Sequence, residues 1–107
     1  MTIGAVATTA LSGMQAQNTR LSATANNIAN ADTIGYSPLS AQFSSAPTGG
    51  VQVTVGEDRP ALPDEASVDL TAEITDLVSA SLSFKANASV FETGADLWDV
   101  LATVRKD

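Results

Sequence analysis

The residues best suited to chemistry are four carboxylates in the middle of the chain: Glu57, Asp58, Asp64 and Glu65. Paired carboxylates can act as general acid and base, and a group of them can hold a cation weakly. Here they lie in a stretch with Pro60 and Pro63, where solvated linker charge is the usual role. The chain has no His and no Cys, so its serines lack an activating imidazole and zinc lacks its usual ligands. We therefore predict no catalytic site, no cofactor, no metal site and no enzyme.

The charge of the chain is concentrated in its second half. Residues 1–56 hold only Arg20 and Asp32, whereas residues 57–107 hold eleven acidic and four basic residues and carry the whole net charge of −7. Acidic surfaces repel phosphate groups, so binding to nucleic acid or to anionic lipid is not expected. No apolar run is long enough for direct membrane insertion, and the N-terminus lacks the pattern of a cleaved secretory signal. The nearly uncharged first half is expected to be covered on most sides in the working state.

Residues 2–30 predict a long helix. The composition is 44% hydrophobic but only 5% aromatic, and it is rich in Ala, the best helix former. Apolar residues recur at spacings of four and three, which is typical of one helix packing along another: Ile3, Ala7, Ala10, Met14, Leu21 and Ile28. Gln17 and Thr24 interrupt this series, while Gly4 and Gly13 allow another backbone to approach closely.

The middle of the chain, residues 32–66, has a different character. It holds all four prolines and four of the seven glycines. Residues 51–55 alternate between β-branched and other side chains, which predicts a short strand. Residues 39–43 are the candidate hairpin partner, joined through a long loop, and residues 56–66 follow as an acidic linker. We expect this short, partly β segment to form a small lobe at one end of the helices.

Residues 68–105 predict the clearest helix, with Ser67 or Asp69 as the candidate N-cap. One stripe of residues follows strict spacing of four and three: Leu70, Ile74, Leu77, Ser81, Phe84, Ala88, Phe91, Ala95, Trp98 and Ala102. A second stripe adds Val78, Val90, Leu97, Leu101 and Val104. One stripe suffices to pack against the first helix, so two stripes imply a second partner.

The sequence therefore predicts a mainly α fold in which two long terminal helices pair antiparallel in a coiled-coil-like manner. Residues 1–31 with 67–107 would form a helical core domain, and residues 32–66 a loop or β-hairpin lobe with an acidic linker. Because a single pair of helices cannot cover both stripes, we expect the monomer to be weakly stable and to complete its core by assembly.

The stretch from Ala25 to Tyr36 carries the most specific motif. Asn26, Asn27 and Asn30 lie where the first helix should end, and Asn competes with the backbone for hydrogen bonds there. With the preceding Ser12-Gly13-Met14-Gln15-Ala16-Gln17 and Arg20-Leu21, it resembles the N-terminal signature of the bacterial flagellar rod and hook axial proteins. At the other end, Val68-Asp69-Leu70, Glu73, Val78-Ser79-Ala80-Ser81 and Phe84-Lys85-Ala86-Asn87 are similar to the terminal helix of the proximal rod proteins.

The resemblance implies a function that spacing alone does not give. Members of this family are exported through the flagellar type III apparatus without a cleaved signal peptide, and their terminal helices pair and stack helically. The chain would then be a structural subunit of the periplasmic basal-body rod that transmits torque. Its partners would be further copies, other flagellar axial proteins and the export apparatus. The middle segment is shorter than the family pattern, so the axial position stays open, and a non-polymerising adaptor or regulator is the alternative.

The predicted subunit-interface residues come from both helices and from the asparagine motif: Ile3, Met14, Leu21, Asn26, Asn27, Ile28, Asn30, Leu77, Phe84, Asn87, Val90, Phe91, Leu97, Trp98 and Leu101. Two alternatives stay open at this point. The asparagines either cap the helix or hydrogen-bond neighbouring subunits or the adjoining loop. Asn87 either sets the register between helices or faces water.

Overall fold

The computed structural model describes residues 2–58, 60 and 63–106 and has overall dimensions of 70 × 25 × 13 Å. Four elements follow in the order α1 (Ile3–Ala29), β1 (Leu39–Ser45), β2 (Val51–Glu57) and α2 (Leu70–Lys106). The predicted fold class is confirmed. A long helix lies at each end of the sequence, and a short two-stranded antiparallel sheet lies between them along the chain. Residues 59 and 61–62 of the predicted acidic linker lie outside the described residues, as do residues 1 and 107.

Capping side chains explain where both helices begin and where α1 ends. The Thr2 side chain accepts a hydrogen bond from the N–H of Ala5, so Thr2 is the N-cap of α1. Asn30 is the C-cap of α1. At the start of α2, the Asp69 carboxylate accepts from the N–H of Ala72 at 3.2 Å, so Asp69 takes the predicted capping role.

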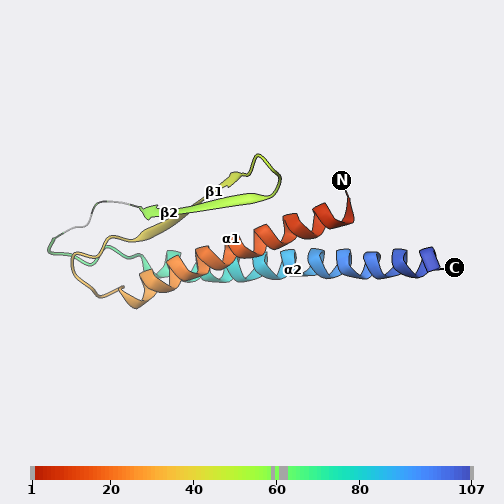
Figure 1. Ribbon diagram of the computed structural model, residues 1–107. Helices are drawn as coiled ribbons and strands as arrows, with labels where there is room; N and C mark the ends of the chain where they lie inside the picture. The colour runs from red at the N-terminus through yellow and green to blue at the C-terminus, as the bar shows by residue number, and fades with distance from the viewer. Residues whose placement is uncertain (1, 59, 61–62, 107) are drawn as a thin grey trace.

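The helices pair antiparallel, and α2 continues beyond the N-terminal end of α1 (Figure 1). The fully buried apolar side chains within the described residues are all Ala: Ala10, Ala16, Ala23 and Ala80. Small side chains let the two helix backbones approach closely, but they bury little apolar area each. The helix pair is therefore held by close contact along a narrow line rather than by a thick core.

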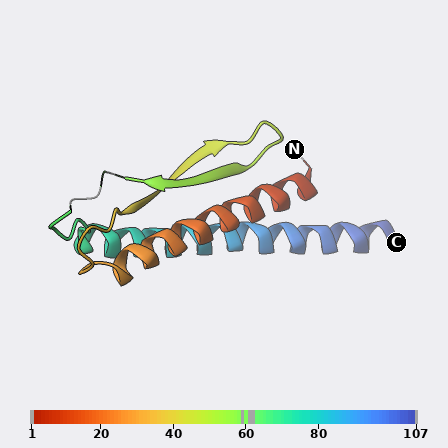
Figure 2. The ribbon, with the colours of Figure 1, turned by 60° about the vertical axis from the view of Figure 1, so that its left-hand side comes forward.

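The hairpin is longer than expected and lies in a different place. Its strands pair from Leu39 opposite Glu57 to Ser45 opposite Val51, and the connection contains Gly49 and Gly50 with φ of +98° and +86°. These left-handed conformations favour glycine. The hairpin packs along α1 and makes no contact with α2 in the described part of the chain (Figure 2). The expectation of a lobe at one end of the helices was wrong: α1 is the middle layer between the hairpin and α2.

Contacts between the tip of the hairpin and Ser12 of α1 account for this placement. The Ser12 hydroxyl accepts a hydrogen bond from the N–H of Val51 at 3.1 Å and donates to the carbonyl of Thr9 at 2.7 Å. A Cβ on Gly50 would collide with the Ser12 side chain, so this glycine also permits the close approach. The tip of the hairpin is thereby fixed to the N-terminal half of α1.

Candidate assembly surface

Asn27 forms the polar junction between three elements of the chain. Its side-chain N–H groups donate to the carbonyl of Leu39 at 2.8 Å and to the carboxylate of Glu73 at 3.0 Å. Its side-chain oxygen accepts from the N–H of Leu39 and from the hydroxyl of Tyr36, both at 2.8 Å. A carboxamide has two donors and two acceptor sites, so every hydrogen-bonding position of Asn27 is used within the chain. The side chain is only 1% exposed, which makes this junction a fixed part of the fold.

The junction places titratable groups in an unusual environment. Burial raises the pKa of the Glu73 carboxyl above its ordinary value, the hydrogen bond from Asn27 lowers it in part, and the charges of Asp76, Asp58 and Asp69 raise it further. Burial also raises the pKa of Tyr36, and the charge of Glu73 adds to this. Desolvation and like charges both disfavour the ionised carboxylate. Burial first, and the neighbouring acidic residues second, thus favour the protonated form of Glu73 in the folded chain.

The other two asparagines of the motif close the C-terminal end of α1. The Asn30 side chain donates to the carbonyl of Asn26 at 2.9 Å and to its side-chain oxygen at 3.1 Å. Thr33 in turn donates to the side chain of Asn30 at 3.2 Å. Within the chain, Asn30 caps the helix with Asn26 as its acceptor, whereas Asn27 binds the adjoining segment and α2. Hydrogen bonds from these asparagines to neighbouring subunits stay a prediction.

A line of residues on α2 spaced by seven faces α1: Glu73, Ala80, Asn87 and Gly94. We call this line the inner seam. Its first member accepts from Asn27, Ala80 is 0% exposed, and a Cβ on Gly94 would lie 3.9 Å from that of Ala7. Leu70 and Ile74, which begin the predicted stripe, are both exposed, so this stripe does not contact α1 along its whole length.

Asn87 and Gly13 form the closest approach along the inner seam. A Cβ on Gly13 would lie between 2.5 and 2.8 Å from three atoms of the Asn87 side chain, so any larger residue at that position of α1 requires the amide or the helices to shift. Asn87 also donates to the carbonyl of Ser83 at 3.0 Å, which satisfies one of its N–H groups on its own helix. The half-buried amide fits opposite a single glycine, and this supports the register role over the solvent-facing alternative.

One ion pair reinforces the same arrangement near the junction. The guanidinium of Arg20 pairs with the carboxylate of Asp76, and its Nε lies 3.4 Å from the second carboxylate oxygen. Arg20 is the one basic residue of the first half of the chain, so this contact compensates part of the acidic charge at the start of α2. The pair is partly exposed and contributes little to stability by itself.

Large apolar side chains remain exposed along the length of α2. They comprise Leu70, Ile74, Val78, Leu82, Phe84, Val90, Phe91, Leu97, Trp98, Val100, Leu101 and Val104. Leu82 is 62% exposed and Trp98 is 60% exposed. Single exposed apolar residues are normal, but a continuous set on one element marks a surface that binds another protein.

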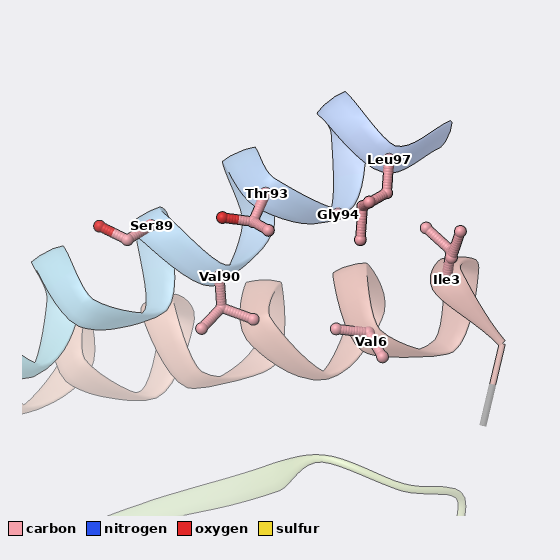
Figure 3. A pocket seen from close by; sticks show the side chains of 7 residues that line it. All are labelled: Ile3, Val6, Ser89, Val90, Thr93, Gly94 and Leu97. Atoms are coloured by element: carbon pink, nitrogen blue, oxygen red, sulfur yellow. The ribbon is translucent and has the colours of Figure 1, made fainter. Parts of the chain in front are cut away.

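Apolar hollows mark both edges of the junction between the helices. One has a volume of about 270 Å³ and is lined by Ile3 and Val6 of α1 and by Val90, Gly94 and Leu97 of α2, among others (Figure 3). A second, of about 200 Å³, lies where Ala7 meets Phe91 and Trp98. Their linings contain few charged groups. Their shape and chemistry therefore suit an apolar side chain of another helix rather than a polar substrate.

The structure distributes the predicted interface residues over three environments. Seven are exposed: Asn26, Phe84, Val90, Phe91, Leu97, Trp98 and Leu101. Seven are half-buried: Ile3, Met14, Leu21, Ile28, Asn30, Leu77 and Asn87. Asn27 is buried and serves the chain's own fold. The close approach at Gly13 was expected from the sequence. Sequence reasoning missed Leu82 and Val100 as exposed apolar residues and Ala80 as a contact residue, although the seven-residue spacing of the inner seam was present.

Two further properties bear on the class of protein. No helix in the described ranges is both long and apolar enough to cross a membrane. Among the residues that the structure describes, no three His, Cys, Asp or Glu side chains are grouped as metal ligands. What the structure does show is a pair of long helices with many large apolar side chains exposed along α2. This arrangement defines the class: a mainly helical protein with much exposed apolar surface.

Comparison with known proteins finds matches to one family. Residues 8–36 match the family described as flagella basal body rod protein, and this range includes the asparagine motif. The flagellar hook protein FlgE of Brucella abortus is 41% identical over 75 residues, covering 64% of this chain and 19% of that protein. The FlgE hook protein of Rhizobium meliloti is 40% identical over 78 residues, covering 64% of this chain and 18% of that protein. These matches support the family of flagellar rod and hook axial proteins, and the resemblance noted from the motifs is confirmed.

The chain is much shorter than these relatives. The chain spans at most 19% of the length of these hook proteins. The family consists of structural flagellar components and is not an enzyme family. The activity and partners of the longer relatives therefore enter only as a proposal.

Proposed function

We propose that this chain is a structural subunit of the flagellar basal-body rod, which polymerises helically through its terminal helices and transmits torque. The observation that carries the proposal is the set of large apolar side chains that stay exposed along the length of α2. Burying one Val, Leu or Phe side chain contributes roughly 1.5–3 kcal/mol, so a dozen exposed ones leave a large driving force for association. The matches to rod and hook proteins support the same direction.

The proposed roles differ between the helices and the hairpin. Residues 1–31 and 67–107 form the axial core domain, and residues 32–66 form a small lobe that lies on α1. The exposed predicted residues Val90, Leu97, Trp98 and Leu101 make the centre of the interface. The half-buried residues along the helix junction, such as Ile3 and Met14, form its edges.

The proposed cellular setting comes from the family. The chain acts in the periplasmic part of the flagellum, leaves the cytoplasm through the flagellar type III export apparatus without a cleaved signal peptide, and contacts other axial proteins. The acidic surface described above agrees with a protein that binds neither nucleic acid nor lipid. An export assay in a flagellated strain with and without a working type III apparatus tests this part of the proposal.

Assembly is tested by measuring helicity and mass as the concentration of the purified chain is raised. If subunits complete each other's core, sedimentation velocity shows growing species, and the helical circular dichroism signal per residue rises with concentration. A chain that stays monomeric and fully helical at high concentration contradicts polymerisation.

The alternative is an adaptor or regulator related to rod proteins that no longer polymerises. Changing Val90, Leu97 and Leu101 together to Ser separates the two functions, because these side chains are exposed and their loss leaves the helix intact. A rod subunit loses assembly and motility with this variant, whereas an adaptor keeps both. The control is a matched variant at two exposed charged positions of the same helix, Lys85→Ala with Glu92→Ala.

A further inference from the structure

Each strand of the hairpin is paired on one side only, because the sheet consists of β1 and β2 alone in the described part of the chain. Just beyond the two ends of the ladder, the N–H of Asp58 donates to the carbonyl of Pro38 at 2.7 Å, and the N–H of Ala46 donates to that of Gly50 at 3.0 Å. Hydrogen-bonded pairs in an antiparallel ladder recur at every second residue. The even-numbered residues therefore bond across the hairpin, and the odd-numbered residues of both strands turn their backbone N–H and C=O groups outward.

Two side chains of α1 close part of these outer edges. The Asn27 carboxamide binds both the carbonyl and the N–H of Leu39, each at 2.8 Å, and so takes the place of a neighbouring strand at one end of β1. The Ser12 hydroxyl accepts from the N–H of Val51 at 3.1 Å at the opposite end of the hairpin. Both bonds agree with the outward direction of the odd-numbered residues.

The rest of the outer side of β2 is not closed. We call residues 53–57 of this side the open edge. The outward N–H and C=O groups of Val53 and Val55 bond to no group within the described residues. Val55 is 43% exposed. A row of unpaired backbone groups of this kind binds another extended chain, because each group finds its partner at the repeat of a β-strand.

The composition of β2 favours strand addition. Its sequence, Val-Gln-Val-Thr-Val-Gly-Glu, contains neither Lys nor Pro, the residues that commonly protect an edge, and its single charge is Glu57 at the end. Val and Thr also have high strand propensity. The edge of β1 is less suited, because Asn27 closes both groups of Leu39 and the strand is rich in Ser.

A second copy of the same strand complements the open edge. When two copies of β2 run antiparallel about a two-fold axis at Thr54, Val53 of each copy lies opposite Val55 of the other, and Glu57 lies opposite Val51. No like charges then meet, although the chain carries a net charge of −7. Pairs of β-branched residues and of threonines across neighbouring strands are favourable.

The helices beneath the hairpins also fit this arrangement. Two hairpins in one sheet are two strand spacings apart, about 10 Å from centre to centre. Because α1 contacts both strands of its hairpin (Figure 2), the two α1 helices would lie at about the same separation. Packed helices are normally about 8–10 Å apart, so the helix layer would close without a gap. The one charged side chain of α1, Arg20, is already paired with Asp76.

We propose that β2 binds β2 of a second copy of this chain, so that the two hairpins form one antiparallel four-stranded sheet over their two α1 helices. A hairpin alone is marginal in water, and a sheet of three or more strands on helices is not. The contact is isologous and closes with two members. It goes beyond the proposed function, because it uses the hairpin instead of α2 and describes the chain before it polymerises.

Disulfide cross-linking tests this contact, because the chain has no cysteine of its own. Thr54→Cys in the full chain places two sulfurs on the two-fold axis, in a pair whose Cα atoms are about 4.5 Å apart, close enough for a disulfide. Oxidation below the concentration at which sedimentation shows growing species is expected to give a dimer on a non-reducing gel. The control is Gln42→Cys, since Gln42 is exposed and lies directly opposite Thr54 in the hairpin. Its two copies would be three strand spacings apart, about 14 Å, so no dimer is expected.

A pair of proline variants tests which edge is used. In the Thr54→Cys chain, Val55→Pro removes an outward N–H of β2 and keeps the hydrogen bonds within the hairpin. It is expected to reduce the dimer yield at least about tenfold. Ala41→Pro removes the outward N–H directly opposite, on β1, and is expected to leave the yield within about twofold. Circular dichroism at the same concentration checks that each variant keeps its helices.

The outcomes separate this inference from the proposed function. A dimer from Thr54→Cys that is lost with Val55→Pro and kept with Ala41→Pro supports pairing through β2. Equal yields from Thr54→Cys and Gln42→Cys, or equal losses with the two prolines, overturn it. Growing species in sedimentation without a Thr54→Cys dimer at any concentration overturn this inference and leave the polymerising subunit standing. A cross-linked dimer with no larger species at any concentration supports this inference and contradicts the proposed function.

Discussion

The two ends of the helix pair differ in how their side chains are satisfied. At the end where α1 leads into the hairpin, Asn27 joins α1, β1 and α2 and uses each of its hydrogen-bonding positions within the chain. At the other end, Trp98 and Leu101 line open hollows and remain largely exposed. Polar groups are thus paired inside the subunit, while apolar area is left for contacts outside it. The difference teaches that folding and assembly use separate parts of one short helix pair.

The largest expected effect comes from Asn27→Ala at the polar junction. The change leaves the N–H and the carbonyl of Leu39, the hydroxyl of Tyr36 and the carboxylate of Glu73 without this partner. Each buried unsatisfied group costs roughly 1–3 kcal/mol, so we expect the free energy of unfolding to fall by about 3 kcal/mol or more. Urea denaturation followed by circular dichroism, at one fixed protein concentration, measures the change.

The exposed neighbour Asn26 provides the matched control for this prediction. Asn26→Ala removes an amide of the same kind outside the junction, and it is expected to change the free energy of unfolding by no more than about 1 kcal/mol. Equal losses for the two variants would show that the junction has no special role.

The second prediction concerns the close approach of Gly13 to Asn87. Gly13→Ala places a Cβ within 2.8 Å of three atoms of the Asn87 side chain, so the helices must separate or the amide must move. Overpacking of this kind costs about 1–3 kcal/mol, which exceeds the gain in helix propensity. The double variant with Asn87→Ala is expected to recover most of the loss, and a double-mutant cycle measures the coupling.

A second glycine of the same helix tests whether crowding is the cause. Nothing but the Thr2 side chain at 3.9 Å lies near a Cβ on Gly4. Gly4→Ala is therefore expected to stabilise the chain by about 0.5–1 kcal/mol. A loss of stability at Gly4 as large as that at Gly13 would contradict the crowding explanation.

The sequence gives the elements more reliably than their faces. Both helices, both strands and the cap at Asp69 follow from periodicity, β-branching and side-chain chemistry, and all are present. The inner seam was not found because Ala80 and Gly94 are too small to register as an apolar stripe. Close packing selected the small residues for the closest contact with α1 and left most of the large apolar side chains of α2 exposed.

The candidate site shows the same limit. The asparagine motif identified the family and the end of α1. The motif alone did not show that Asn27 pairs with both backbone groups of Leu39, since this depends on where the hairpin lies. Local capping chemistry predicted Asn30 correctly, while the role of Asn27 required the tertiary arrangement of three elements.

A smaller effect is expected from pH, through Glu73. Its pKa is raised in the folded chain, so folding favours the protonated carboxyl. The contribution to stability is fully present below the pKa of the unfolded chain, whose ordinary value is 4.5, and is lost as pH rises through the folded pKa. Glu73→Gln keeps an oxygen for Asn27 and removes this titration. We expect the variant to gain stability over the original chain as pH rises from 4 to 7, measured by urea denaturation at each pH.

An Asp69→Asn variant distinguishes the junction from general acidity. It removes one of the neighbouring charges but retains an N-capping side chain. The pH dependence is then expected to persist with smaller amplitude. If Glu73→Gln and the original chain change with pH in parallel, the carboxylate at the junction is not the titrating group.

The smallest effect on folding, and the sharpest contrast with Asn27, is expected for Trp98→Ala at the open end. Trp98 is 60% exposed, so the free energy of unfolding of the monomer is expected to change by less than about 1 kcal/mol. Its loss should instead weaken association, because aromatic side chains commonly dominate the energy of protein interfaces. Sedimentation velocity and urea denaturation on the same sample separate the two quantities. A variant that unfolds readily but still associates would reverse the assignment of folding to one end and assembly to the other.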